Sequence, residues 1–465
     1  MKQLFEFSSF QENVCLKTDE GEELTYGQFQ KDADAIKSHL TKGRLAFCLC
    51  TNRIPSIVGY VALVQQGVAT VLLDADKEAS LLDNLLEIYH PNYLWAPLDR
   101  SYGRLLFEYR GYALFEYALE AVDINPDLAL LLTTSGSTGS PKLVRLTQSN
   151  LRSNAESIAE YLHIDENERP VTSLPMYYSF GMSVINSHLI KGATVLLTEK
   201  TVMQKEFWDY VRKERATSFA GVPYTYEMLR RLRFMRMDLP DLKTMIQAGG
   251  KLNAEIAKEY IEWASGQGKE FIVIYGQTEA APRMSYLPFD KALQKYASIG
   301  VAIPGGRFSL CDADDREIDS PDVDGELVYR GENVCMGYAE TPADLLKGDE
   351  NQGVLHTGDV ARMDADGFYY ITGRMKRFVK IWGNRVNLDA IEQMVKGVTS
   401  DCAAIGVDDK ITVFVTNESF SQPVKTLLSE KTGLNPNAFE VRVIASIPKK
   451  NSGKIDYAEL KDIDL

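Results

Sequence analysis

The sequence has few of the residues that cross-link small folds or bind metals. Of its 465 residues, six are cysteine and five are histidine, and no two cysteines form a Cys-X-X-Cys pair. Thinly spread cysteines are typical of reduced thiols in a cytosolic protein, and their distance from the histidines disfavours a zinc site. A chain of this length buries several cores without such cross-links.

The sequence also lacks a net positive charge and long apolar runs. The formal net charge is −14, so no global positive field is available to hold a nucleic-acid backbone. No segment approaches the roughly 18 apolar residues of a membrane span, and the first ten residues lack the apolar core of a signal peptide. We therefore expect a cytoplasmic protein that binds no nucleic acid and has no membrane span.

Short apolar strands alternate with helical patterns in the N-terminal part of the chain. We expect strands over 46–50, 68–74, 192–197 and 217–222, and helices over 54–65, over 207–215 and from Leu151 onward. This alternation predicts an α/β fold with βαβ units and largely parallel sheets. Tight turns and short β segments predict a small β-rich subdomain over about 305–372. We expect a large N-terminal domain over 1–375 and a small C-terminal domain over 376–465.

A loop rich in hydroxyls and glycines follows the apolar segment 128–132. The residues with a use in holding a polyphosphate are Thr134, Ser135, Gly136, Ser137, Thr138, Gly139 and Lys142. Glycines let backbone N–H groups converge on anionic oxygens, hydroxyls donate hydrogen bonds or meet a metal, and the lysine neutralises charge. The alternative is a flexible linker, but the loop lies between two apolar segments, 128–132 and 143–147, which favours a phosphate site.

The segment Thr134–Lys142 closely resembles the signature loop of the AMP-forming acyl-adenylate ligases. This superfamily includes acyl- and aryl-CoA synthetases, the adenylation domains of peptide synthetases and beetle luciferases. A second segment, 275–279, is similar to the family's second nucleotide motif. The resemblance implies that Tyr275, with Gly276 and Gln277, contacts adenine, that Thr278 contacts the α-phosphate, and that Glu279 helps to hold Mg²⁺.

Later motifs follow in the family's order. By resemblance, Asp359 accepts the ribose hydroxyls, Arg374 lies near the ribose, and Lys376 is the hinge of a mobile α+β C-terminal domain. Arg377 stands where relatives often have an acidic residue. The segment 379–387 is similar to the family's thiol tunnel, with Gly383 where a pantetheine arm passes.

The segment 448–456 closely matches the family's C-terminal catalytic loop. The resemblance makes Lys454 the catalytic lysine, whose ammonium bridges the attacking carboxylate and the phosphate. Taken alone, a basic segment of this kind is an ordinary solvated surface.

The acid substrate is expected to contact two aromatic-rich segments. The candidate wall residues are Tyr177, Tyr178, Phe180, Gly181, Val222 and Pro223, and Gly249 and Gly250 resemble part of the adenine pocket. Gly181 stands where amino-acid-activating relatives typically have an aspartate that pairs with the α-ammonium. A buried ammonium without that partner is costly, which favours a fatty, acyl or aryl acid. Each aromatic side chain is equally well explained as ordinary core.

The resemblance implies a two-step ligase. ATP and Mg²⁺ activate a carboxylic acid to acyl-AMP with release of pyrophosphate, and a thiol then displaces AMP. The thiol belongs either to CoA or to the phosphopantetheine of an acyl carrier protein. The alternatives are an amino-acid adenylation domain, a hydrolytic or light-emitting relative, and a nucleotide-binding protein that has lost the chemistry.

Overall fold

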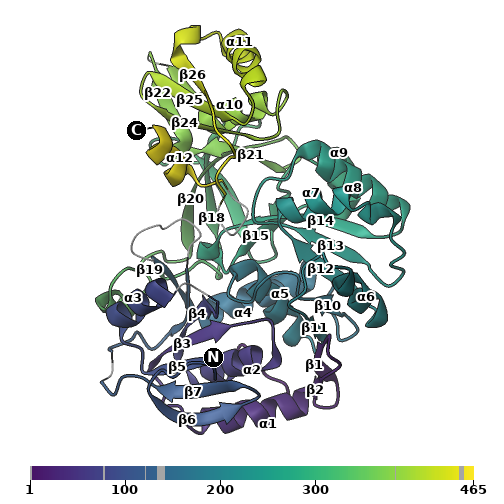
Figure 1. The fold of residues 1–465 in the computed structure, drawn as a ribbon, viewed down its shortest axis with the longest axis vertical. Coiled ribbons are helices and arrows are strands. Elements are labelled where there is room, and N and C mark those ends of the chain that lie inside the picture. Colours follow the sequence, from purple (N-terminus) through teal and green to yellow (C-terminus); the bar gives the residue numbers. More distant parts are fainter. Residues whose placement is uncertain are drawn as a thin grey trace. The chain divides into compact units, whose positions relative to one another are not determined.

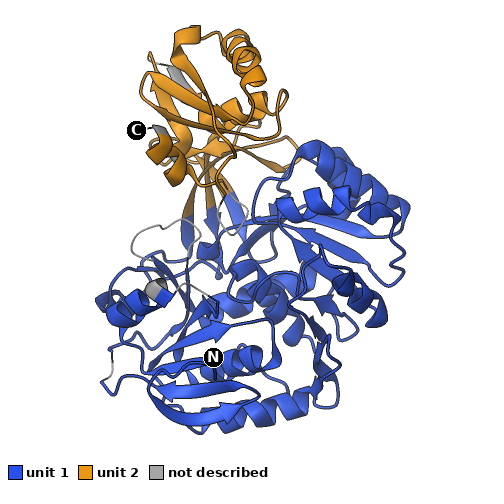
Figure 2. Ribbon diagram, viewed as in Figure 1, with its two compact units in different colours: residues 1–308, 329–355 blue, residues 309–328, 356–465 orange. Residues whose placement is uncertain are grey.

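The computed structural model describes residues 3–76, 79–120, 122–133, 142–382, 384–449 and 455–464. Packing divides the chain into two compact units, residues 1–308 with 329–355 and residues 309–328 with 356–465 (Figure 2). The domain boundary expected at 375/376 stays a prediction, because the two compact units divide the chain at 308/309, 328/329 and 355/356.

One sheet of the first unit supplies most of the candidate site. Its strand order in the described chain is β16-β15-β14-β13-β12-β10-β11-β1-β2. The strands from β14 to β1 run parallel, whereas β15, β16 and β2 are antiparallel. The bounds are β1 Val14–Thr18, β2 Glu23–Thr25, β10 Pro170–Val171, β11 Val195–Leu197, β12 Ser218–Gly221, β13 Thr244–Gln247, β14 Glu270–Gly276, β15 Arg283–Tyr286 and β16 Val301–Ala302.

A second sheet of the same unit leads into the phosphate-loop segment. Its order in the described chain is β19-β9-β8-β4-β3-β5-β7-β6, with β8, β4, β3 and β5 parallel. The central strand β3 is buried along its whole length, as expected for a parallel strand covered on both faces. The bounds are β3 Leu45–Cys50, β4 Ala69–Asp74, β5 Tyr93–Pro97, β6 Arg104–Tyr109, β7 Tyr112–Glu116, β8 Leu128–Thr133, β9 Leu143–Thr147 and β19 Gly337–Ala339.

Helices pack against both sheets of the first unit (Figure 1). Two of them, α4 and α5, pack against each other and are used below. The bounds are α1 Tyr26–Lys37, α2 Ile54–Gln66, α3 Ala79–Tyr89, α4 Gln148–Tyr161, α5 Ser179–Leu189, α6 Lys205–Lys213, α7 Pro223–Arg231, α8 Ala254–Gly266 and α9 Phe289–Lys295, with short 3₁₀ turns η1 Phe234–Arg236, η2 Thr278–Ala280 and η3 Pro342–Leu346.

The second unit combines a hairpin, a small sheet and three helices among its described residues. Its C-terminal sheet has the order β24-β25-β26, and a further sheet, β17-β18-β20-β21, lies mostly in this unit. The bounds are β17 Arg307–Cys311, β18 Gly325–Arg330, β20 Val354–Met363, β21 Tyr369–Arg374, β22 Phe378–Ile381, β23 Asn384–Asn387, β24 Cys402–Val407, β25 Lys410–Val415, β26 Phe439–Val443, α10 Leu388–Val395, α11 Ser421–Thr432 and α12 Tyr457–Asp464, with 3₁₀ turns η4 Met375–Arg377, η5 Glu418–Phe420 and η6 Pro436–Ala438.

The expected α/β class is confirmed, and the largest differences in element bounds are at β11 and α4. The strand expected over 192–197 is shorter, since β11 begins at Val195. Helix α4 begins at Gln148, because the Thr147 side chain accepts from the backbone of Asn150 and the Asn150 side chain accepts from the backbone of Thr147.

All six cysteines are buried. Among the helices in the described ranges, none has the length and apolar character needed to cross a bilayer.

Candidate active site

Three parallel strands of the larger sheet end where candidate residues begin. Val222 follows β12, Ala248 follows β13 and Gln277 follows β14. Residues 218–221, 244–247 and 270–273 are paired in register across these strands. Ligand sites in open α/β sheets lie beyond the carboxyl ends of the strands, so this edge is the expected place for a site.

Several residues that the sequence predicted to line the acyl and adenine pockets lie close to Gly249. This glycine has φ of +81°, and a Cβ there would lie 2.7 Å from Tyr178 Oη and 3.1 Å from Val222 Cγ1. A Cβ on Gly250 would lie 3.3 Å from Pro223 Cγ. The close approach of Tyr178 therefore requires a residue without a side chain at 249.

Helix α5 begins at the next predicted segment. Phe180 is buried with Val184 and with side chains of β12, β13 and β14. A Cβ on Gly181 would lie 2.2 Å from the carbonyl oxygen of Pro175, so the helix start leaves no room for a side chain. Tyr177 packs against a different cluster from Phe180 and Tyr178. Burial, with the charge of nearby Asp74, raises the pKa of Tyr177 well above its usual range.

The segment 275–279 turns sharply at the end of β14. A Cβ on Gly276 would lie 2.0 Å from the carbonyl oxygen of Pro282. Gln277 Nε2 donates to Tyr275 Oη at 3.3 Å. The hydroxyls of Thr278 and Ser179 lie 3.2 Å apart, which places the turn beside the first residue of α5.

Glu279 and Lys142 share one neighbour, Tyr338 on β19. Tyr338 Oη donates to Glu279 Oε1 at 2.8 Å, and the carbonyl oxygen of Glu279 accepts from the backbone N–H of Cys335. Lys142 Nζ lies 3.8 Å from the centroid of the Tyr338 ring and 3.4 Å from Glu340 Oε1. Burial and the Glu279 charge raise the pKa of Tyr338 well above its usual range, so its hydroxyl remains a donor.

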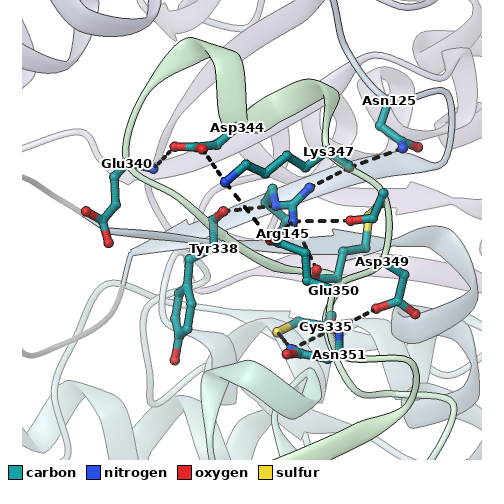
Figure 3. Close-up of polar contacts among 12 residues, drawn as sticks. Asn125, Arg145, Cys335, Tyr338, Glu340, Asp344, Lys347, Asp349, Glu350 and Asn351 are labelled. Atoms are coloured by element: carbon teal, nitrogen blue, oxygen red, sulfur yellow. Dashed lines mark hydrogen bonds and ion pairs between the residues drawn. The ribbon is translucent and has the colours of Figure 1, made fainter.

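A buried arginine contacts the segment 336–350, which carries Tyr338. Arg145 on β9 is fully buried and ion-paired to Glu350 at 2.6 Å. Figure 3 shows its guanidinium at the centre of this segment. Its remaining bonds go to the carbonyl oxygens of Met336, Tyr338, Lys347 and Gly348. We call this arrangement the Arg145 clamp.

The second unit places two predicted ribose residues side by side. Asp359 on β20 pairs in register with Arg374 on β21, and Arg374 Nε lies 3.2 Å from Asp359 Oδ1. Asp359 is buried, whereas the Arg374 side chain is largely exposed. The carboxylate is thus already oriented by a cation.

Several predicted site residues lie outside the described residues. They are Thr134, Ser135, Gly136, Ser137, Thr138, Gly139, Gly383 and Lys454. The side chain of the hinge residue Lys376 is also outside them, although its backbone lies in η4. The structure therefore describes the two flanks of the phosphate loop, Thr133 and Lys142.

The donors around Glu279 fit a magnesium ion that is shared with a bound phosphate. Mg²⁺ keeps several waters and is usually held by one or two carboxylates plus substrate phosphates. No cluster of three or more His, Cys, Asp or Glu suited to a metal was found over the described ranges. A single carboxylate, on the residue that follows Thr278 in the chain, matches a phosphate-dependent ion and does not match a closed structural site.

Sequence reasoning missed Ser179, Tyr338 and Arg145. The Tyr338–Glu279 bond joins residues 59 positions apart, so no local pattern could reveal it. Arg145 did leave a signal, because it is a lone charge within the apolar strand Leu143–Thr147. A charge at such a position is almost never buried without partners, which predicts a polar cluster.

Comparison with known proteins gives one family and many relatives. A family model described as AMP-binding enzyme matches residues 99–339. A feruloyl-CoA synthase from Amycolatopsis sp. is 30% identical over 350 residues, which cover 72% of this chain and 67% of the relative. A long-chain-fatty-acid–CoA ligase from Escherichia coli O157:H7 is 32% identical over 359 residues, which cover 72% of this chain and 62% of the relative. The aligned segments thus span about two thirds of these relatives.

Solved structures share the fold at lower identity. The O-succinylbenzoate CoA synthetase MenE from Bacillus subtilis in complex with AMP superposes with a TM-score of 0.80 at 20% identity, covering 98% of this chain and 97% of that one. ATP-bound MatB from Rhodopseudomonas palustris gives a TM-score of 0.78 at 20% identity, with 99% of each chain covered.

Proposed function

Because the chain belongs to the AMP-binding enzyme family, we propose that it is an ATP-dependent, AMP-forming acid–thiol ligase. In the first step, a carboxylate oxygen of the acid attacks the α-phosphorus of ATP, and the bond to the β-phosphate breaks to release pyrophosphate. In the second step, a thiolate attacks the acyl carbon, and AMP leaves with the oxygen that joined it to the acid.

The observation that carries this proposal is the common neighbour of Lys142 and Glu279. Lys142 ends the predicted phosphate loop, Glu279 ends the second nucleotide motif, and both contact Tyr338. A cation and an acid that bind the same polyphosphate must lie close together. Their meeting at one tyrosine supports a shared triphosphate site.

Each remaining residue receives a role on the same basis. Glu279 would hold Mg²⁺ and Thr278 would donate to the α-phosphate. The ion, when bound, offsets negative charge on the phosphate oxygens. The hydroxyl–glycine loop would hold the phosphates, Tyr275 with residues 249–250 and 276–277 the adenine, and Asp359 the ribose. Lys454 would bridge the two reacting anions.

The acid is proposed to lack an α-amino group. An aspartate that pairs with an ammonium cannot sit at 181 without moving the backbone, because the Cβ position is 2.2 Å from the Pro175 carbonyl oxygen. The acid would lie between Phe180 with Tyr178 and the segment 222–223. Activities named for the relatives, feruloyl-CoA synthase and long-chain-fatty-acid–CoA ligase, also concern acids without this group.

CoA is the proposed acceptor, and the cytoplasm is the proposed compartment. The relatives above are CoA synthases and CoA ligases, which favours CoA over a carrier protein. In the arginine-rich segment 230–236, Arg230 is paired with Glu259 at 2.7 Å, so it is not a free cation for an acidic carrier. An acyl carrier protein remains the second candidate acceptor.

The test is acid-dependent formation of AMP and pyrophosphate from ATP with Mg²⁺. A panel of short, long and aromatic acids and amino acids is compared, each with CoA and with a phosphopantetheinylated carrier protein. We expect AMP, with Glu279→Gln lowering the rate about 100-fold and the exposed-surface control Glu262→Gln leaving it unchanged. Formation of ADP, acid-independent turnover, or an amino acid as the best substrate would contradict the proposal.

A further inference from the structure

Arg283 is a buried cation that the proposed reaction does not use. It begins β15, is 1% exposed, and faces Gly276 across the antiparallel pair of β14 and β15. Its Nε donates to Ser183 Oγ on α5 at 3.0 Å, and its Nη1 donates to Tyr161 Oη on α4 at 3.1 Å. The third nitrogen, Nη2, is buried and has no hydrogen-bond partner.

The charge of this guanidinium is not balanced by a carboxylate. In the described part of the chain, no Asp or Glu forms an ion pair with Arg283, and its two partners are neutral hydroxyls. Buried charges in proteins are normally paired, because an isolated ion loses its hydration. Arg145, the other fully buried arginine described above, is balanced by Glu350. Arg283 thus lacks both an anion and one acceptor.

The unpaired group lies beside a proposed wall of the acid site. The Arg283 guanidinium carbon is 5.2 Å from the centroid of the Phe180 ring, a proposed wall of the acyl pocket. Gly276, opposite Arg283, lies in the nucleotide motif two residues before Thr278. An anion that neutralised Arg283 would therefore sit beside the acid, on the wall formed by α5.

A second buried donor without a partner comes from α4. Ser157 Oγ is buried and unbonded, and Ser157 precedes Tyr161 by four residues, on the same helix face. Asn154 Oδ1 is also unbonded, while Asn154 Nδ2 donates to the Arg283 carbonyl oxygen. A carboxylate can accept from a guanidinium and a hydroxyl together, whereas an apolar chain leaves both unpaired.

We propose that Arg283 binds a second carboxylate on the acid substrate, so that the enzyme activates dicarboxylic acids in preference to monocarboxylic acids. This inference rests on the proposed ligase function. It sets this chain apart from ligases of long apolar acids, because a long hydrocarbon beside Arg283 would leave its charge unbalanced.

The test compares pairs of acids that differ only in the second carboxylate: butanoate with butanedioate, hexanoate with hexanedioate, and benzoate with benzene-1,4-dicarboxylate. For at least one pair we expect kcat/KM for pyrophosphate release to be 10-fold or more higher for the diacid. Arg283→Met should lower the diacid value 10- to 100-fold and change the monoacid value less than 3-fold. Arg283→Lys should retain part of the preference, and Arg152→Met, which removes a half-buried arginine of α4 that is paired with Glu156, should keep all of it.

Equal loss of both acids in Arg283→Met would assign the residue a structural role and overturn the inference, as would a preference for monoacids in the natural enzyme. Calorimetric titration with the same diacids separates this from failure of the ligase proposal. Arg283-dependent binding without pyrophosphate release would leave the subsite standing and reject the ligase. If no diacid is bound and none is turned over, the subsite is rejected. A water molecule is then the remaining hydrogen-bond partner for Nη2.

Discussion

Tyr338 is the residue that joins Lys142 and Glu279, the two residues proposed to bind the triphosphate and its metal ion. Its hydroxyl holds one oxygen of Glu279, and its ring faces the ammonium of Lys142. A carboxylate fixed at one oxygen presents the other in a defined direction, which prepares it to meet a metal ion. On the proposed function, the tyrosine would act on the metal through Glu279 and is therefore a positioning residue.

Replacing Tyr338 with phenylalanine tests this role. The change removes a hydrogen bond to a charged group, worth about 1.5–3 kcal/mol. We expect kcat/KM for pyrophosphate release to fall about 10-fold and the Mg²⁺ concentration for half-maximal rate to rise. The surface variant Tyr117→Phe is the control, since Tyr117 is 40% exposed. A slower enzyme with an unchanged Mg²⁺ requirement would contradict positioning through Glu279.

His188 on α5 predicts a pH dependence of stability. Burial lowers its pKa from 6.5 to about 4, with Arg283 adding to the shift, while the bond to the Val184 carbonyl and the charge of Glu168 oppose it. Between these values the unfolded chain binds a proton that the folded chain does not. Stability is therefore present in full above pH 6.5 and is lost as pH falls toward 4.

Urea unfolding from pH 7.5 to 4.5 measures this loss. We expect the His188 contribution to approach about 3 kcal/mol. His188→Asn, which keeps a donor near the Val184 carbonyl, should show a flatter pH profile than the natural protein. Parallel profiles for the two proteins would show that His188 is not the titrating group.

At the scale of elements, the start of α5 depends on a missing side chain. The Cβ position of Gly181 overlaps the Pro175 carbonyl oxygen, whereas a Cβ on Gly266, the last residue of α8, meets nothing within 4 Å. Gly181→Ala should lower the free energy of unfolding by about 2–3 kcal/mol. Gly266→Ala should leave it unchanged or raise it by up to about 1 kcal/mol. Thermal and urea unfolding of both variants measure these changes. Equal loss of stability in the two variants would show that the overlap at Gly181 is not the cause.

The elements that apolar runs mark were predictable from the sequence, and their pairing was not. Apolar runs located β3, β4, β8 and β9, since a buried parallel strand has few polar positions. The shorter β11 and the earlier start of α4 depend on sheet pairing and on a capping box. The sequence also did not predict the Arg283 subsite, because the surroundings of its unpaired nitrogen come from β15, α4 and α5, which meet only in the fold.

At the scale of the whole molecule, the second unit contains the segments beside both the proposed hinge residue, Lys376, and the proposed catalytic residue, Lys454. Arg377, next to the hinge residue, is bonded to Asp389 and Glu392, and its guanidinium lies 4.0 Å from the centroid of the Tyr457 ring. Tyr457 also donates to Glu392 and follows Lys454 by three residues. Arg377, beside the proposed hinge residue, and Tyr457, after the proposed catalytic lysine, are therefore parts of one packed cluster.

Lys454→Ala tests whether the two half-reactions use different arrangements of the chain. We expect loss of acid-dependent pyrophosphate release, because the lysine offsets the repulsion between the attacking carboxylate and the phosphate. The variant should still convert synthetic acyl-AMP and CoA to thioester. Both half-reactions are measured separately, and Lys461→Ala on α12 is the matched control. Equal loss of the two would reject domain alternation.

Because of the Arg145 clamp, the backbone conformation of the segment 336–350 depends little on the side chains that the segment bears. Four of the five acceptors of its guanidinium are main-chain carbonyl oxygens, which are the same whichever side chain a residue bears. Residues such as Leu346, which is 55% exposed, can therefore be exchanged without altering what anchors the chain. The outer surface of the segment is free to diversify while the tyrosine beneath it keeps its place.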